Sequence, residues 1–385
     1  MAIDYYTDTS EDTLDPAEFE LYTLIMDYRD SLGLPDIPLS QGLTVVAGRH
    51  VLDTIYNFGE YAGHSWSDAP FEPGDSDTFP AMWEAPERIG TGYSDYGFEI
   101  SAGWTVNNDI TTSTMTPERA LELWQDSPPH DDVITSTDPW TEPWNAIGVG
   151  LHQGSAHVWF GRAADPNDGP AIVGAEGAVA ETMNGTRFVD ELRSLAGDDT
   201  VRGLGGADEV YGNQGNDLIK GGAGADTLFG GQNGGDPTAD VNGLMRKQDG
   251  TETVDGGAGD DLVYGNFGAD ILYGGPGDDV LFGGQGSDTL DGGPGDDTLW
   301  GNREPDVLSG GDGADVFYLN GAGADRITDF DPGAGDRLAA IGGFANPRAN
   351  DHDDGMVFSY NDGGGPNHTI LEGLDAADYS ADWLL

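Results

Sequence analysis

The sequence predicts a multidomain protein in which an α+β part is followed by an all-β parallel roll and then by a small β cap. Three observations predict this order. Seven of the nine tryptophans lie before residue 160, as in an ordinary globular core. The middle of the chain is rich in glycine, with 33 of the 62 glycines between residues 194 and 318. In that stretch an aspartate recurs every nine residues, and a short fixed period is typical of a repetitive fold.

The spacing of apolar residues predicts the elements of the first part. One helix is expected over 17–32 and a second over about 43–56. A third begins at Thr116, where a capping side chain precedes a proline. Alternating apolar residues predict two strands, at 146–150 and 156–161, joined by a tight turn. Helices followed by a small sheet make this part α+β.

Changes in composition give the domain boundaries. We expect the first domain over 15–163 and a linker over 164–193. The repeats occupy 194–318 and are interrupted by an irregular insertion at about 232–248. The cap follows over 319–385.

The charge and the composition exclude several classes of protein. Seventy acidic residues against fifteen lysines and arginines give a formal net charge of -55, which argues against a nucleic-acid partner because binding to phosphates requires positive charge. Self-repulsion of this size is costly unless bound cations offset it. The absence of cysteine excludes disulfides and thiolate metal sites. The first twenty residues do not resemble a signal peptide, and no apolar run is long enough to span a membrane.

The repeated unit is GGxGxDxUx, where U is apolar, which is a known calcium-binding signature. An apolar residue stands two positions after every repeated aspartate, and a glycine stands two positions before it except at Glu304. A degenerate copy carries Glu252 at the aspartate position. The xUx triplet is long enough for a short strand with its middle side chain inward, and the other six residues form a turn.

Aspartate carboxylates and backbone carbonyls form an all-oxygen site of the kind that suits Ca²⁺, and paired glycines allow those carbonyls to converge. Without the ion, this anionic, glycine-rich stretch buries too little apolar surface to fold, so we expect it to be disordered at submicromolar calcium and folded at millimolar calcium. The predicted calcium residues are Asp199, Asp208, Asp217, Asp226, Asp261, Asp270, Asp279, Asp288, Asp297, Asp306 and Asp315, with Gly203, Gly206, Gly221, Gly224, Gly256, Gly259, Gly274, Gly277, Gly283, Gly286, Gly292 and Gly295.

With these repeats, 194–318 resembles the RTX (repeats-in-toxin) β-roll of proteins exported by Gram-negative bacteria. The resemblance implies binding of several calcium ions and export through a type I secretion apparatus, which the chain crosses unfolded. Residues 319–385 are similar to the capping and signal segments of that family, since the chain ends in Asp382, Trp383 and two leucines. The location implied is extracellular or on the cell surface. A second interpretation of the last residues is an edge strand that finishes the cap.

The first part resembles the CAP superfamily, and four strings support the resemblance in the order that the family shows. They are the opening helix with Tyr28-Arg29, Gly33-Leu34, Leu43 and Ala47; Gly63-His64-Ser65-Trp66; Tyr96-Gly97-Phe98-Glu99-Ile100; and Trp124 to His130 with Ile147 to Gly150 and Val158-Trp159 beyond. The resemblance implies an α/β/α sandwich.

The CAP resemblance also implies that His64, Glu99 and His130 line one cleft, where many members hold a divalent metal such as Zn²⁺. Two imidazoles and a carboxylate suit that chemistry. The sequence departs from the family at Phe98 and Ile100, and the second family glutamate is either Glu118 or Glu122.

An alternative interpretation of the three cleft residues is that they are ordinary hydrogen-bonded polar side chains, since a helix C-terminus stabilises an imidazole such as His130. His152 and His157 lie in the predicted hairpin with opposite parity, so at most one can face the cleft, and neither is taken as a site residue.

Three functions follow from these features. The leading one is a secreted calcium-binding protein whose CAP module, which is not taken to be an enzyme, binds a ligand or surface that the sequence does not identify. The second is a metal-dependent extracellular hydrolase that uses the CAP cleft. The third is a calcium-dependent adhesin or surface-layer component. The number of calcium ions and the oligomeric state do not follow from the sequence.

Overall fold

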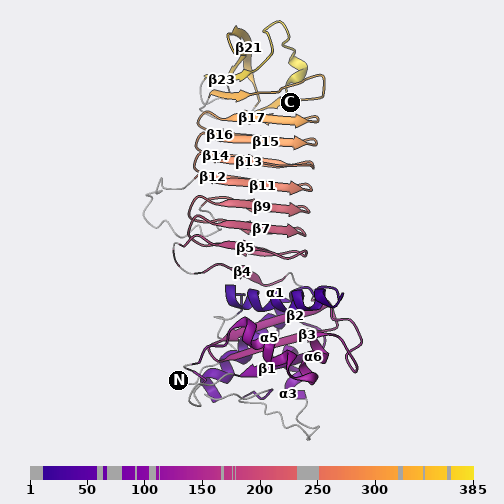
Figure 1. The fold of residues 1–385 in the computed structure, drawn as a ribbon. Coiled ribbons are helices and arrows are strands. Elements are labelled where there is room, and N and C mark those ends of the chain that lie inside the picture. The colour runs from indigo at the N-terminus through magenta and orange to yellow at the C-terminus, as the bar shows by residue number, and fades with distance from the viewer. Residues whose placement is uncertain are drawn as a thin grey trace. The chain divides into compact units, whose positions relative to one another are not determined.

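A computed structural model of the 385-residue chain divides into two compact units, Met1–Val173 and Gly174–Leu385. Unit 1 contains helices and a small sheet, and unit 2 is a β-solenoid with a terminal cap (Figure 1). The residues that the structure describes are 12–58, 64–66, 80–91, 93–103, 110–111, 113–165, 169–175, 177, 179–231, 251–319, 324–340, 343–361 and 366–385.

Unit 1 has an antiparallel sheet of order β1-β3-β2. The three predicted helices are confirmed as α1, α2 and α5, and the two predicted strands as β2 and β3. An Asp15 capping box starts α1, and the Thr116 side chain caps α5. The elements are α1 (Pro16–Ser31), α2 (Gln41–Asp53), a π-helical turn (Thr54–Phe58), α3 (Pro80–Trp83), α4 (Ala85–Ile89), β1 (Gly97–Gly103), α5 (Pro117–Gln125), α6 (Pro128–Ile134), β2 (Ala146–His152), β3 (Ser155–Gly161) and β4 (Ala171–Val173).

Helix α2 packs directly on strand β2 because two glycines leave room for its backbone. A Cβ placed on Gly148 would lie 2.0 Å from the carbonyl carbon of Leu43, and one on Gly150 would lie 2.5 Å from that of Ala47. Leu43 and Ala47 therefore belong to the helix face that meets the sheet. His50 stands one turn further along this face and is fully buried.

Unit 2 winds between two sheets, and the strands of the solenoid are parallel and alternate between the sheets along the chain. One sheet contains β6 (Glu191–Arg193), β8 (Glu209–Tyr211), β10 (Thr227–Phe229), β12 (Leu262–Phe267), β14 (Val280–Gln285), β16 (Thr298–Arg303), β18 (Val316–Tyr318) and β20 (Arg337–Ala339). The other contains β5 (Thr182–Asn184), β7 (Thr200–Gly205), β9 (Leu218–Ala223), β11 (Thr253–Ala258), β13 (Ile271–Tyr273), β15 (Thr289–Pro294), β17 (Val307–Asp312), β19 (Ala324–Ile327), β21 (Ala345–His352), β22 (Gly355–Asn361) and β23 (Pro366–Leu371).

Two nonapeptides make one coil of the solenoid, so residues 18 apart pair in register. Leu281 pairs with Leu299, and Phe282 with Trp300. The apolar residue of each repeat points inward and is at most 1% exposed, which builds a continuous core along the stack. On the outer face of the first sheet, the neighbouring position carries stacked aromatic rings with centroids 3.7–5.6 Å apart, from Tyr211, Phe229, Tyr264, Phe282, Trp300 and Tyr318.

The segment expected as a linker over 164–193 is not a linker throughout, because β5 and β6 already belong to the solenoid. Met183 pairs with Val201 and Leu192 with Val210, so both side chains extend the inward apolar column. These early coils lack the paired glycines by which the repeats were located in the sequence.

The C-terminal part completes the solenoid and then covers its end. Strands β19 and β20 still pair with solenoid strands, whereas β21, β22 and β23 form an antiparallel extension. The chain end returns to the stack, where Leu384 forms a parallel bridge with Leu338 and Trp383 is buried. The insertion expected at 232–248 lies outside the described residues, as does Gly63 of the His64 string.

The inward apolar column predicts a large loss of stability when one of its side chains is shortened. Leu281→Ala is expected to lower the free energy of unfolding of the calcium-loaded chain by about 2–5 kcal/mol, because it leaves a cavity in a close-packed core. Val307→Ala, at a side chain that is 38% exposed, is the matched control and should cost less than about 1 kcal/mol. Equal losses in denaturant titrations would contradict the inward column.

Candidate functional site

The repeated aspartates form a ladder along the solenoid, and one carboxylate oxygen of each has a structural task. The backbone N–H of Asp261 donates to Oδ1 of Asp279 at 2.8 Å, and that of Asp279 donates to Oδ1 of Asp297 at 2.8 Å. The same bond recurs 18 residues apart along the stack. All eleven predicted aspartates are at most 2% exposed. Oδ1 therefore satisfies the backbone of the neighbouring coil.

The second carboxylate oxygen is buried and has no hydrogen-bond partner in the described structure. This holds for Oδ2 of Asp199, Asp208, Asp226, Asp261, Asp279, Asp288, Asp297, Asp306 and Asp315. A buried anionic oxygen without a partner is strongly unfavourable, so a positively charged group is needed beside it.

The predicted glycines enclose these oxygens. A Cβ on Gly274 would lie 2.4 Å from Oδ2 of Asp279 and 2.6 Å from the carbonyl oxygen of Gly292 in the next coil. A carboxylate oxygen and a carbonyl oxygen thus meet in a recess that only glycine leaves open. Half of the predicted glycines have positive φ instead and approach a backbone carbonyl of the adjacent coil, namely Gly206, Gly224, Gly259, Gly277, Gly286 and Gly295.

The metal-free ladder is electrostatically strained. Burial, together with the charges of neighbouring carboxylates, raises the pKa of Asp208 and Asp297 to about 7 and that of Asp306 to about 8. Unpartnered carboxylate oxygens and convergent carbonyls are the donor set that a hard cation such as Ca²⁺ requires, so the residues fit the ion. Calcium, when bound, supplies the charge that neutralises the ladder.

The ladder extends beyond the predicted set at both ends. The N–H of Asp190 donates to Asp208, while Asp325 accepts from the N–H of Asp306 and Asp336 accepts from that of Asp315. The last two bonds span 19 and 21 residues, which breaks the nine-residue period used to find the repeats. An apolar residue two positions after each additional aspartate was the available signal.

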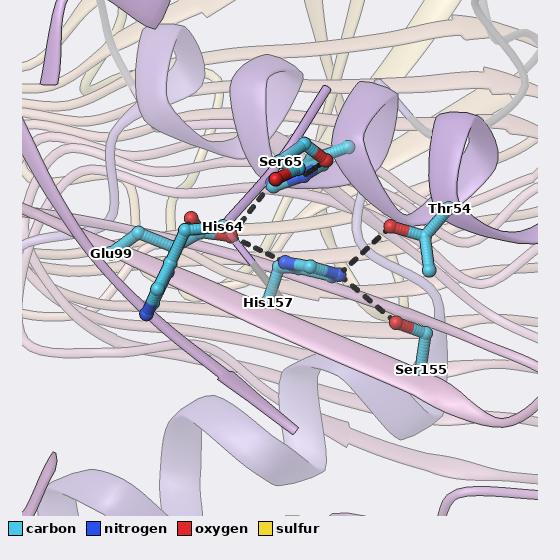
Figure 2. Close-up of polar contacts among 7 residues, drawn as sticks. Thr54, His64, Ser65, Glu99, Ser155 and His157 are labelled. Carbon is cyan, nitrogen blue, oxygen red and sulfur yellow. Dashed lines mark hydrogen bonds and ion pairs between the residues drawn. The ribbon is translucent and has the colours of Figure 1, made fainter. Parts of the chain in front are cut away.

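A second cluster lies in unit 1, where the buried carboxylate of Glu99 is surrounded by imidazoles (Figure 2). Nδ1 of His50 lies 2.7 Å from Oε1 of Glu99, and Nδ1 of His157 also lies close to this oxygen. Nδ1 of His64 lies 2.9 Å from the other carboxylate oxygen, Oε2. The side chains of His50, His157 and Glu99 have no exposed surface, whereas that of His64 is 23% exposed. Three elements supply the enclosed groups, namely α2, β1 and β3.

Burial and charge act against each other in this cluster. Burial raises the pKa of Glu99, but the three imidazoles outweigh it and hold that pKa well below its usual range. Burial and the neighbouring His50 lower the pKa of His157 to about 4. Burial lowers the pKa of His64, but Glu99 raises it more, so the net shift is upward. Of His64 and His157, His64 is therefore the better placed to carry a proton that compensates the charge of Glu99.

The structure brings together two of the three predicted cleft residues. His64 contacts Glu99, and the ring of His130 lies 6.4 Å from that of His64. Both candidates for the second glutamate, Glu118 and Glu122, are exposed on α5. His152 contacts Tyr56 instead of this cluster.

Sequence reasoning set His157 aside and missed His50. The structure places His157 beside Glu99, because β3 pairs with β1. Two signals were available. His157 has the parity of Ser155 and Trp159, which are buried strand residues, and His50 follows Leu43 and Ala47 on one helix face.

The ladder predicts a specific effect of removing one charge. Asp279→Asn keeps a carbonyl oxygen to accept the N–H of Asp261 but removes the anionic oxygen, so it should lower the number of bound calcium ions and raise the calcium concentration needed for folding. Asp278→Asn, at an exposed neighbour, removes the same charge outside the ladder. Calorimetric calcium titrations that show identical losses for both variants would contradict the assignment.

The raised aspartate pKa values predict opposite pH responses with and without calcium. In the metal-free chain the folded-state pKa values of Asp279, Asp297 and Asp306, about 6 to 8, exceed the ordinary value of about 3.9. The stability that the protonated carboxylates contribute to the folded state is therefore complete below about pH 4 and is lost as pH rises through 6 to 8. Calcium affinity should fall as pH drops over the same window, because protons compete for the carboxylates. Circular dichroism in calcium-stripped and calcium-containing buffers measures both responses, and parallel pH profiles would overturn the prediction.

The comparison with protein families agrees with the ladder. The family described as the RTX calcium-binding nonapeptide repeat matches 177–210, 184–219, 202–234, 248–281, 273–308 and 291–327. The solution structure of the AlgE6R3 subunit of the Azotobacter vinelandii mannuronan C5-epimerase is 29% identical and covers 39% of this chain and 85% of its own, with a TM-score of 0.25.

The crystal structure of the extracellular lipase LipA from Serratia marcescens is 17% identical and covers 58% of this chain, with a TM-score of 0.21. The match spans only 40% of the lipase. No curated protein matches the chain. The ladder and the family match together identify the solenoid of unit 2 as a stack of RTX calcium-binding nonapeptide repeats.

Proposed function

We propose that this chain is an extracellular calcium-binding protein of a Gram-negative bacterium, exported unfolded through a type I secretion apparatus and folded by calcium outside the cell. The observation that carries the proposal is the row of buried Oδ2 atoms without partners. None of the described helices is long and apolar enough to cross a membrane.

The chain's own residues explain why folding would wait for the ion. Stacking of the coils brings further carboxylates into the ladder. There Oδ1 accepts from the adjacent backbone, and Oδ2 of the nine aspartates named above has no hydrogen-bond partner among the described residues. The stacked apolar column offers only one inward residue per repeat to offset that cost. Extracellular calcium modules bind in the range of about 0.1–1 mM, which separates the cytosol from the outside.

The proposed export signal is the C-terminal end of the chain. In the folded molecule Leu385 donates its N–H to the carbonyl of Leu338 at 3.0 Å, and the ring of Trp383 lies 5.4 Å from that of Phe330. These contacts bury part of the segment against the end of the solenoid. A secretion apparatus that recognises this segment would therefore bind it before the cap folds.

For unit 1 we propose a CAP-like module with an α/β/α arrangement that binds a ligand or surface. The carboxylate of Glu99 is enclosed by imidazoles, so a molecule at the cleft of His64, Glu99 and His130 would reach His64 first. This enclosure favours a binding module over a metal-dependent hydrolase, in which the carboxylate must reach the substrate or its water.

One experiment tests calcium-dependent folding and a second tests export through the C-terminal segment. In excess chelator the purified chain is expected to lose the β-sheet signal of unit 2, and added calcium should restore it cooperatively. In cells with a type I apparatus, the full chain should appear in the medium, whereas a chain that ends at Asp375 should stay inside. An ordered β signal in chelator, or export of the shortened chain, would contradict the proposal.

A further inference from the structure

The Glu99 cluster has the arrangement of a buried transition-metal site. Three imidazoles turn the same atom, Nδ1, toward one carboxylate, and His50, Glu99 and His157 each offer a ligand atom within 4.8 Å of the others. Imidazole nitrogens with one carboxylate are a donor set that suits Zn²⁺.

The far side of each enclosed ring supports this interpretation. Nε2 of His50 lies 3.0 Å from the carbonyl oxygen of Ser65, and Nε2 of His157 lies 2.9 Å from Oγ of Ser155. A carbonyl can only accept, so Nε2 of His50 must carry the proton. Histidines that bind a metal through one nitrogen typically donate the other N–H to such an oxygen.

Once Nε2 of His50 holds the proton, its Nδ1 presents a lone pair to Glu99. That nitrogen is fully buried and has no hydrogen-bond partner, although it lies 2.7 Å from Oε1. Two lone pairs do not remain this close without a cation between them or beside them. A second proton on His50 is the alternative cation, and it would leave Nδ1–H poorly aligned with the carboxylate.

We propose that unit 1 binds one Zn²⁺ ion through Nδ1 of His50, Nδ1 of His157 and the carboxylate of Glu99, with His64 at the solvent side. This site differs from the cleft of His64, Glu99 and His130, because its two additional ligands come from α2 and β3 and are fully buried. Its role is structural, since it joins α2 to the sheet. It depends neither on the calcium ladder nor on export.

The test measures zinc by elemental analysis and by competition with a zinc-selective chelator, on the full chain in millimolar calcium so that the aspartate ladder is occupied. The unmodified chain should bind one Zn²⁺. His50→Gln and His157→Gln should each lower the affinity more than 100-fold. His152→Gln, at the other histidine of the β2–β3 hairpin, and His130→Gln should leave it within about twofold.

A gentler variant keeps the test decisive if a ligand substitution prevents folding. Ser155→Ala retains every ligand and removes the nearer of two oxygens at Nε2 of His157, the other being Oγ1 of Thr54 at 3.4 Å, so it should weaken zinc binding by about 10-fold. Substitution of Co²⁺ adds a spectroscopic check, because the visible spectrum of bound Co²⁺ depends on the number and type of its ligands.

Three outcomes would overturn the inference. One is a chain that binds no zinc when folded in calcium. Another is zinc binding that survives His50→Gln and His157→Gln but is lost in His130→Gln, which would place the metal in the outer cleft. The third is unchanged affinity in Ser155→Ala. None of these bears on calcium-dependent folding, so failure here is distinguishable from failure of the proposed function.

Discussion

Unit 2 depends on aspartate carboxylates in which the protein gives a hydrogen bond to one oxygen and not to the other. Oδ1 of each ladder aspartate holds the backbone N–H of the adjacent coil, which sets the 18-residue register, as between Asp261 and Asp279. In nine of the predicted aspartates, such as Asp279, Oδ2 is buried and has no hydrogen-bond partner among the described residues, whereas Oδ2 of Asp190 and of Asp336 accepts from a nearby backbone N–H. The contact that aligns the coils therefore also creates the need for a cation. Stacking and ion binding cannot be separated in such a design.

Unit 1 compensates a buried carboxylate in a different way. Glu99 is enclosed by His50, His64 and His157, and they lower its pKa where burial alone would raise it. At the ladder aspartates of unit 2, burial and the charges of neighbouring carboxylates raise the pKa values, as at Asp208 and Asp306. Glu99 thus has imidazoles of its own chain around it, whereas calcium must supply the positive charge at the ladder.

The solenoid was predictable because its period is short and local. Each repeat carries its own turn glycines, its aspartate and its apolar residue within nine positions, so the repeats are visible in the sequence itself. Prediction failed where the paired glycines were missing or the period changed. Asp190 lies in a segment without paired glycines, and Asp325 and Asp336 follow at irregular spacing, yet the same backbone bond includes all three in the ladder.

The sequence by itself determined the helices of unit 1, the β-roll and the identity of the ladder residues, because those features rest on interactions within a few positions. It determined His64 and Glu99 as candidates only through their local strings. Tertiary structure alone decided that His50 and His157 join them. The antiparallel pairing of β1 with β3, and the approach of α2 to the glycines of β2, bring together side chains more than a hundred residues apart. No local pattern records such a contact, since it arises from packing of whole elements.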